Sequence, residues 1–508
     1  MTQQLKKGQN IGTEISGANC IVEKRLAEGG QGEVYQVNVN GKSMALKWYF
    51  PHIVEQDPRQ KQRLQKAIQM GAPNDRFLWP VDLAVTPEQP SSYGYIMALR
   101  EPRFKSLNDL VKRRIEPSFR ALVTAAFELA DSYYQLHAKG LCYRDISFGN
   151  AFFDPDTGEV RICDNDNVDV NKMSGTVAGT PRFMAPEIVR GEANPSTQTD
   201  LFSLTVLLFY ILFNHHPLEG AKEQAIHCFD LAAMTKIYGT EAVFIFDPND
   251  DSNRPVPGVQ DNPLAFWPIY PQSLRDLFTR AFTDGIRDPE NGRVQENEWR
   301  KTMLNLRDSI MYCPHCGEQN FYDVDALKKQ GKLNPCWSCQ EEIVAPPRIR
   351  ISSKNPENAS LQENEWYNTM LNWQDSIIYC THCGEENFYD VDTLKKQGKL
   401  NPCRSCGKEI VTPPPTRISS KIIMLNHDTK LFPHHVDEGK KYDFSAPVAQ
   451  VVRNPKNPNL WGLKNLTTTK WVVTTANNNI KDVKPGRSVT LAVGTKINFG
   501  TELGEIKV

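Results

Sequence analysis

The hydrophobic pattern of the first 310 residues changes along the chain. Short runs rich in β-branched and aromatic residues come first, at 19–26, 33–39, 43–49 and 93–99, and they predict strands. Longer apolar runs at 118–136 and 200–213 predict helices. A β-rich part followed by a helical part favours an α+β arrangement with two lobes.

The last part of the chain, residues 421–508, has a different pattern. Short strand-like runs occur at 448–453, 461–466, 469–475, 488–493 and 496–499, with glycine and proline between them. The segment is rich in Val, Thr, Asn and Gly and contains no cysteine. Many short strands separated by turn residues are typical of a β-sandwich.

Two cysteine arrays lie between these parts, within residues 311–347 and 378–415. In each array, 19 residues separate two Cys-x-x-Cys pairs, a spacing typical of a zinc site. Four thiolates close a tetrahedron around the ion and leave no open position, so each site would be structural. We therefore predict two zinc ribbons with two structural zinc ions. The ligands would be Cys313, Cys316, Cys336 and Cys339, and then Cys380, Cys383, Cys403 and Cys406.

The arrays belong to a larger repeat. Residues 295–299 recur at 362–366, residues 320–325 at 387–392, and residues 327–335 at 394–402. This near identity indicates a tandem duplication of one helix and one metal knuckle, with the second helix expected at 365–378. The polar segment 348–360 predicts a flexible linker, so residues 348–377 would comprise a linker and the duplicated helix.

The balance of acidic and basic residues bears on which binding partners the protein needs. The 508 residues carry 59 Lys and Arg against 60 Asp and Glu, a net charge of −1, which demands neither nucleic acid nor an anionic membrane. The sequence has no run of 18 apolar residues and no apolar segment at its beginning. These features predict a cytoplasmic protein, in which paired cysteines bind metal rather than form disulfides.

Candidate chemistry is confined to the first 310 residues. Gly29 and Gly32 lie between two predicted strands, where glycine lets backbone N–H groups approach phosphates, although a tight turn alone would also explain them. Lys47 falls in the third predicted strand. Asp145 and Asn150 follow in the segment 143–150, and Asp164 follows in 161–166. The segments 179–187 and 200–204 and the residue Arg293 complete the series.

Motifs in this order resemble those of the eukaryotic-like protein kinase superfamily, over about residues 15–310. The resemblance implies a bilobal kinase domain at 1–310 that uses ATP and Mg²⁺ to phosphorylate Ser or Thr of a protein substrate. Asp145 would be the catalytic base, Lys47 would pair the α- and β-phosphates, and Asn150 and Asp164 would hold Mg²⁺. The remaining nucleotide contacts would come from the phosphate loop and the adenine hinge: Ala27, Gly29, Gly32, Met97, Ala98 and Leu99.

The resemblance also implies supporting residues. Glu187 and Arg293 would form a buried ion pair, and Asp200 would tie down the catalytic-loop backbone. Arg144 could pair with a phosphate on Ser174 or Thr176, although both are equally well explained as exposed loop hydroxyls. Thr180 would orient the substrate.

Several positions depart from the kinase pattern. Ser147 replaces a lysine that touches the γ-phosphate, and the magnesium motif reads Asp164-Asn-Asp166. Residues 59–70 contain no acid to pair with Lys47, and Gln62 or Gln65 falls nearest the expected place. The ion pair of Lys47 is therefore lost or supplied differently, while Asp166 could add a metal contact. Two hypotheses follow: an active kinase, or a pseudokinase scaffold that binds nucleotide and partners without turnover.

The end of the chain, from Pro485 to Gly500, resembles forkhead-associated domains, although their phosphate-binding Ser-x-x-His element is not recognisable. A generic β-sandwich is the alternative. The order of kinase, ribbons and sandwich resembles bacterial kinases that accompany a phosphatase or a von Willebrand-type protein. Such partners are implied, and nucleic acid and membrane are not.

Overall fold

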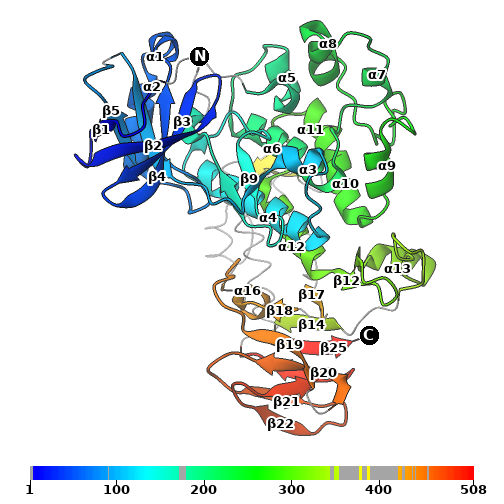
Figure 1. The fold of residues 1–508 in the computed structure, drawn as a ribbon. Helices are drawn as coiled ribbons and strands as arrows, with labels where there is room; N and C mark the ends of the chain where they lie inside the picture. The colour runs from blue at the N-terminus through cyan, green and yellow to red at the C-terminus, as the bar shows by residue number, and fades with distance from the viewer. Residues whose placement is uncertain are drawn as a thin grey trace. The chain divides into compact units, whose positions relative to one another are not determined.

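The computed structural model describes most of the chain, in two compact units, Met1–Val344 and Ala345–Val508. The described residues are 4–89, 91–170, 179–343, 348–353, 377–379, 386–388 and 421–507, without 426–428, 438, 441, 455–456 and 501. Each unit is considered by itself below (Figure 1).

The first unit begins with a closed β-barrel. Its strand order is β1 (Asn10–Thr13), β2 (Asn19–Glu28), β3 (Gly32–Val39), β4 (Lys42–Tyr49), β6 (Tyr93–Ala98) and β5 (Asp82–Val85). The four predicted strands of this lobe are confirmed as β2, β3, β4 and β6, whereas β1 and β5 were not predicted. Two helices, α1 (Pro51–Gln56) and α2 (Gln60–Met70), follow β4.

Strand β4 is buried on both faces, which explains its nearly continuous apolar sequence. Leu46 and Trp48 point into one core cluster. Ala45 and Tyr49 point into another, which includes Leu64 of α2. Because side chains alternate along a strand, Lys47 shares the face of Ala45 and Tyr49.

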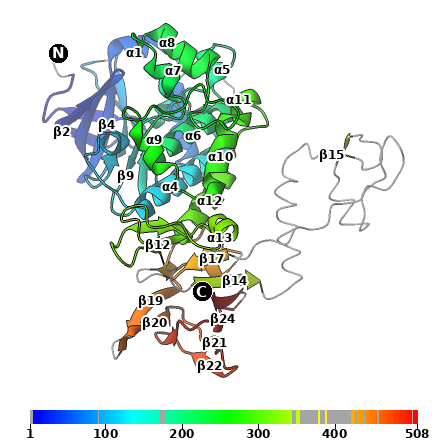
Figure 2. The same cartoon turned by 90° about the vertical axis from the view of Figure 1, so that its right-hand side faces the viewer.

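The second lobe is helical. Its long helices are α4 (Phe119–Ala138), α6 (Thr197–Phe213), α10 (Gln272–Phe282) and α12 (Glu296–Asp308), and the predicted helices at 118–136 and 200–213 are confirmed. The lobe also contains six shorter helices (Figures 1 and 2): α3 (Leu107–Val111), α5 (Pro186–Val189), α7 (Ala221–Gln224), α8 (Leu231–Thr235), α9 (Asp261–Phe266) and α11 (Asp284–Arg287). Every residue of α6 from Thr199 to Phe213 is buried, so this helix forms the centre of the lobe.

Three short antiparallel pairings carry the candidate catalytic segments. Strand β9 (Ala151–Phe153) pairs with β10 (Val160–Ile162) and with β7 (Lys105–Ser106). Strand β8 (Leu141–Cys142) pairs with β11 (Asp169–Val170). Residues 143–150 therefore run between two anchored strands.

The first cysteine array packs against the helical lobe within the same unit. Its hairpin consists of β12 (Ile310–Tyr312) and β13 (Gln319–Phe321), and α13 (Val324–Gln330) follows. The Phe321 ring lies 5.2 Å from Phe119 of α4 and 5.1 Å from Tyr270, measured between centroids. The Arg120 backbone N–H donates to Gln319 Oε1 at 2.9 Å. The ribbon therefore shares a core with the lobe that precedes it.

The second unit is a sandwich of two antiparallel sheets. One sheet has the order β17 (Lys421–Met424), β14 (Arg348–Ser353), β25 (Glu502–Lys507), β24 (Lys496–Asn498), β21 (Trp471–Thr474) and β22 (Ile480–Val483). The other has the order β18 (Lys430–Leu431), β19 (Ala449–Asn454), β20 (Asn457–Asn465) and β23 (Ser488–Thr490). A short helix, α16 (Pro433–Val436), follows β18. Trp471, Leu463 and Ile497 contribute to one core between the sheets.

The predicted flexible linker at 348–360 is wrong at its first six residues, which form strand β14 (Arg348–Ser353). Its six residues pair in register with β25, from Arg348↔Lys507 to Ser353↔Glu502, and four of them also pair with β17. The sandwich therefore starts at Arg348, and the second repeat copy lies between two neighbouring strands of one sheet.

The second copy is described only at its hairpin. Strands β15 (Ile377–Tyr379) and β16 (Glu386–Phe388) pair as Ile377↔Phe388, the counterpart of Ile310↔Phe321 in the first copy. The predicted helix 365–378 is therefore wrong at its last two residues, which belong to β15. Cys380, Cys383, Cys403 and Cys406 lie outside the described residues.

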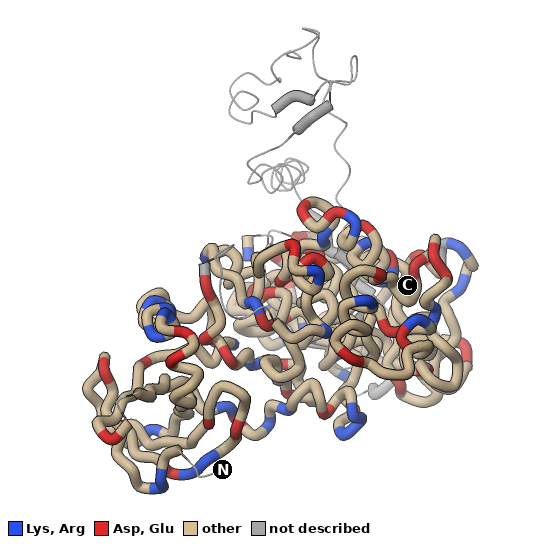
Figure 3. Tube along the Cα trace, turned by 90° about the horizontal axis from the view of Figure 1, so that it is seen from above, with Lys and Arg blue, Asp and Glu red and all other residues tan. Residues whose placement is uncertain are grey.

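The charges of the described chain are mixed. Figure 3 shows basic and acidic residues interspersed along the trace, in keeping with the balanced composition. Among the described helices, none has the length and apolarity needed to span a bilayer.

Candidate active site

The segment 143–150 is fixed at its start by a buried carboxylate on α6. Asp200, with 1% of its surface exposed, accepts hydrogen bonds from the backbone N–H groups of Tyr143 and of Arg144, the latter at 2.9 Å. Arg144 adopts a left-handed conformation with φ of 75°, which L-residues rarely adopt without such support. The expected tie between Asp200 and this loop is present.

Asp145 lies immediately after this tie and is held from two sides. Thr180 Oγ1 donates to Asp145 Oδ1 at 2.7 Å. Asn150 Nδ2 donates to the Asp145 carbonyl at 2.8 Å and to Oδ2 at 3.2 Å. The carboxylate is half-buried and oriented, as a proton acceptor must be.

Asn150 and Asp164 are brought together by the β9–β10 hairpin. The register Ala151↔Ile162 places Asn150 opposite Cys163, whose N–H donates to the Asn150 carbonyl at 2.8 Å. Because Asn150 directs its amide nitrogen to Asp145, its Oδ1 is left for another ligand. One amide oxygen beside one carboxylate suits a hard cation such as Mg²⁺.

Lys47 is a buried cation of the site, with 5% of its side chain exposed. Its Nζ donates to Asp166 Oδ2 at 2.8 Å, to Gln31 Oε1 at 2.9 Å and to Asp164 Oδ1 at 3.0 Å. Burial alone would lower the pKa of Lys47, but the Asp166 and Asp164 carboxylates outweigh it and raise the pKa above its usual value. The ammonium is therefore charged in this cluster.

Polar side chains hold the turn that begins at Asp164. Asp164 has a left-handed φ of 51°, which turns the chain into the short 3₁₀ helix at Asn165–Asn167. Asn165 is fully buried, and its Nδ2 donates to the carbonyls of Leu78 at 2.9 Å and Ile162 at 3.1 Å. The Tyr143 hydroxyl donates to the Cys163 carbonyl. Hydrogen bonds to the backbone thus hold this turn in place.

The two loop glycines have different surroundings. Gly29 closes the β2–β3 turn, where its N–H donates to the Gly32 carbonyl at 2.9 Å, and a Cβ there would meet little. At Gly32, a Cβ would lie 2.1 Å from the Trp48 carbonyl oxygen, so the β3–β4 approach requires glycine. Ala27 is exposed near the end of β2.

The three predicted hinge residues lie together at the end of β6. Met97 is buried in the cluster with Tyr49 and Tyr95, Ala98 is exposed, and Leu99 is half-buried. The backbone at Ala98 and Leu99 thus reaches the surface beside the core.

Arg144 has an acidic neighbour in the described residues. Its Nη2 lies 3.3 Å from Asp169 Oδ2, and the same oxygen lies 4.0 Å from Arg63 Nε of α2. Ser174 and Thr176, the predicted phosphosites, lie outside the described residues.

Ser147 stands where the kinase pattern has a lysine that touches the γ-phosphate, and its side chain is buried.

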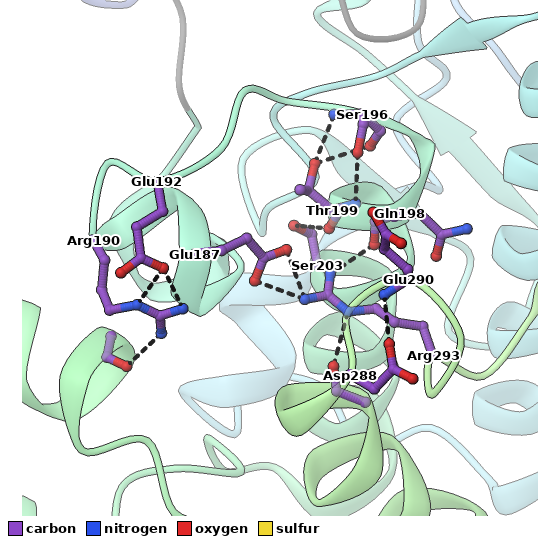
Figure 4. A network of polar contacts seen from close by, with 12 residues as sticks. Glu187, Arg190, Glu192, Ser196, Gln198, Thr199, Ser203, Asp288, Glu290 and Arg293 are labelled. Carbon is purple, nitrogen blue, oxygen red and sulfur yellow. Dashed lines mark hydrogen bonds and ion pairs between the residues drawn. The ribbon is translucent and has the colours of Figure 1, made fainter.

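The predicted ion pair beneath the site is present. Arg293 Nη2 donates to both oxygens of Glu187 at 2.8 Å, and its Nη1 and Nε donate to the carbonyls of Gln198 and Gly285 (Figure 4). Both side chains are buried. This ion pair joins the helix after the segment 179–185 to the C-terminal part of the lobe.

Sequence reasoning missed His137, a residue of α4 that keeps 9% of its side chain exposed. Its Nε2 lies 3.0 Å from Asp200 Oδ2, and its Nδ1 contacts Glu296 Oε1 of α12. Burial lowers the pKa of His137, but hydrogen bonds to Asp200 and Glu296 raise it from 6.5 to about 9. No local pattern marks this residue, because its partners lie 63 and 159 positions away.

We expect His137 to make stability fall as the solution becomes alkaline. The folded protein keeps the proton up to pH about 9, whereas the unfolded chain releases it near 6.5. The contribution of His137 to the free energy of unfolding is therefore fully present below pH 6.5. It amounts to about 3 kcal/mol and is lost as the pH rises from 6.5 to 9. Chemical denaturation across this range checks it, because His137→Gln should remove most of the slope. Equal slopes in both proteins would contradict the assignment.

The first cysteine array forms one compact cluster. The sulfurs of Cys313, Cys316, Cys336 and Cys339 all lie within 4.8 Å of one another, with two pairs at 3.6 Å. Sulfurs bound to a tetrahedral zinc about 2.3 Å away lie about 3.8 Å apart, so the cluster fits that ion. Asn320 Nδ2 lies 3.5 Å from Cys336 Sγ. Burial alone would raise the pKa of Cys336, but hydrogen bonds from the Cys339 and Ser338 backbone and from Asn320 lower it to about 6.

Comparisons with known proteins agree on one family. The family model described as "Protein kinase domain" matches residues 21–284. A probable serine/threonine-protein kinase of Zea mays, CCRP1, is 27% identical over 219 residues, which cover 42% of this chain and 34% of that protein. The DNA damage-responsive serine/threonine-protein kinase RqkA of Deinococcus radiodurans is 29% identical over 210 residues, covering 40% and 30%. Protein kinase MCK1 of Saccharomyces cerevisiae is 23% identical over 277 residues, covering 52% and 70%. The chain thus spans about a third of the length of the first two relatives.

Proposed function

The chain belongs to the protein kinase domain family, and on this premise we propose that it is an active serine/threonine protein kinase. It would transfer the γ-phosphoryl group of ATP to a hydroxyl of a protein substrate. The observation that carries the proposal is the arrangement of Asp145, Asn150, Asp164 and Lys47. Asn150 donates to Asp145, Lys47 donates to Asp164, and the N–H of Cys163, the neighbour of Asp164, donates to the Asn150 carbonyl.

The residues divide the work of the reaction. Asp145, oriented by Thr180 and Asn150, accepts the proton of the attacking hydroxyl. Lys47 binds phosphate oxygens with its ammonium group. Gln31 must first move aside, because its Oε1 accepts one of the Lys47 Nζ hydrogen bonds. Asn150 and Asp164 would hold Mg²⁺, which supplies positive charge to the transferred group. The Ala98–Leu99 backbone would receive the adenine.

Phosphoryl transfer by the full-length chain tests the proposal. We expect γ-labelled ATP with Mg²⁺ to yield labelled phosphoserine or phosphothreonine on the chain itself or on a generic basic substrate, and EDTA to abolish the label. If the chain bound ATP, seen as a raised melting temperature, but transferred no phosphate at any Mg²⁺ or Mn²⁺ concentration, the pseudokinase alternative would replace this proposal.

We propose further that the Cys313–Cys339 cluster holds a structural zinc ion. Replacing Cys336 by serine should remove one equivalent of zinc per chain, measured by elemental mass spectrometry. It should also lower the melting temperature, because Phe321 packs on the helical lobe. Cys228→Ser is the matched control, since that cysteine is exposed and outside the cluster. Unchanged zinc content in Cys336→Ser would count against the site.

A further inference from the structure

The buried ammonium of Lys47 needs a permanent counter-ion. It lies on the face of β4 that α2 covers, next to Tyr49 and Ala45. An unpaired charge at such a place would be strongly destabilising, so we expect the fold to supply a carboxylate nearby.

Helix α2 does not supply it. Its buried residues are Gln60, Leu64 and Ala67, whereas Gln62 and Gln65, the two expected nearest to Lys47, are exposed. Gln60 Oε1 is engaged by the Tyr93 hydroxyl at 3.1 Å. Helix α2 therefore offers Lys47 no carboxylate. The same helix contacts the 3₁₀ turn at Asn165–Asn167.

That turn carries Asp166. Its side chain is fully buried, and Oδ2 accepts hydrogen bonds from Lys47 Nζ, at 2.8 Å, and from the Tyr49 hydroxyl. Asp164, by contrast, keeps 39% of its side chain exposed. The two carboxylates that share Lys47 thus differ in access to solvent: one is enclosed and the other is open.

We infer that Asp166 is the positioning residue of Lys47. It takes the place of an acidic residue on α2, and it leaves the exposed Asp164 available for the metal ion. Asp166 acts through Lys47 and touches neither nucleotide nor metal. This inference rests on the proposed function only in assigning phosphate binding to Lys47, because the ion pair itself is independent of activity.

A stability cycle tests the pair without nucleotide. Lys47→Met and Asp166→Asn each remove one partner, and each should lower the melting temperature by on the order of 5–10 °C. The double variant should lose clearly less than the sum of the two, since no buried charge remains unpaired. Asp75→Asn, an exposed aspartate in the loop after α2, is the matched control and should melt like wild type. Additive losses would overturn the pairing.

Nucleotide titrations then test the positioning role, with ADP as the probe, in EDTA and in Mg²⁺. In EDTA, Asp166→Asn should weaken binding by about tenfold, as should Lys47→Met, and the double variant should be no weaker than Lys47→Met. Asp164→Asn should lose the gain in ADP affinity that Mg²⁺ brings to wild type.

If Asp166→Asn lost only the Mg²⁺-dependent gain, Asp166 would be a metal ligand and the inference would be wrong. If wild type bound no ADP in either condition, the nucleotide role of Lys47 in the proposed function would fail, and with it the positioning role. The stability cycle would still decide whether Asp166 is the counter-ion.

Discussion

Replacing Asp145 by asparagine is expected to lower the rate of phosphoryl transfer by about 10²- to 10⁴-fold. Asparagine has the same size and can still accept the Thr180 hydrogen bond, but it cannot take a proton from the substrate hydroxyl. The Asn150 bond to the residue-145 carbonyl, 2.8 Å long, does not involve the side chain and should persist. Initial rates of autophosphorylation on the full chain measure the effect.

The control for this change is Asp156→Asn, which alters an exposed aspartate in the β9–β10 turn and should keep the wild-type rate. The melting temperature of Asp145→Asn should stay close to that of wild type. A folded Asp145→Asn protein with an undiminished rate would exclude Asp145 as the base.

Replacing Arg293 by methionine is expected to destabilise the kinase domain by about 3–5 kcal/mol. The change leaves the Glu187 carboxylate buried with neither of its two 2.8 Å hydrogen bonds from Arg293. It also deprives the Gln198 and Gly285 carbonyls of their donors. For a domain of this size the melting temperature should fall by about 10 °C, as calorimetry would record.

Figure 4 contains the matched control, the ion pair between Arg190 and Glu192 at the protein surface. Arg190→Met should change the melting temperature little, because exposed pairs are screened by water. The double variant Glu187→Met/Arg293→Met should be more stable than Arg293→Met alone. If both arginine variants melted alike, burial would not be what makes the Glu187 pair strong.

Local patterns predicted four of the six barrel strands, β2, β3, β4 and β6, and the helices α4 and α6, because their burial repeats every two or every three to four residues. The candidate site was predicted from motif order. The structure shows two hydrogen-bonded pairs, Lys47 with Asp164 and Asn150 with Asp145, and a backbone bond from Cys163, the neighbour of Asp164, to the Asn150 carbonyl. For the ion pair of Lys47, the sequence left two possibilities open: that it is lost or that it is supplied differently. Asp166 reaches it through the left-handed turn at Asp164, and no sequence spacing reports such a turn.

Long-range strand pairing explains why residues 348–353 were predicted as part of a linker and not as a strand. The segment 348–353 alternates Arg and Ile at its start, which is a strand signal, but its polar surroundings favoured a linker. Its partner β25 lies about 150 residues later, at Glu502–Lys507, so no neighbouring hairpin revealed it. Its other partner, β17, is separated from it by the whole second repeat copy.

Strand β14 precedes the second repeat copy in the sequence, whereas both strands that pair with it follow that copy. A single cut anywhere between residues 354 and 420 would leave β14 on the N-terminal fragment and both of its partner strands on the C-terminal one. Six backbone pairs with β25 and four with β17 would still hold the fragments together. Such a nicked protein should elute as one species under native conditions and separate only in denaturant, as a split protein joined by a shared strand.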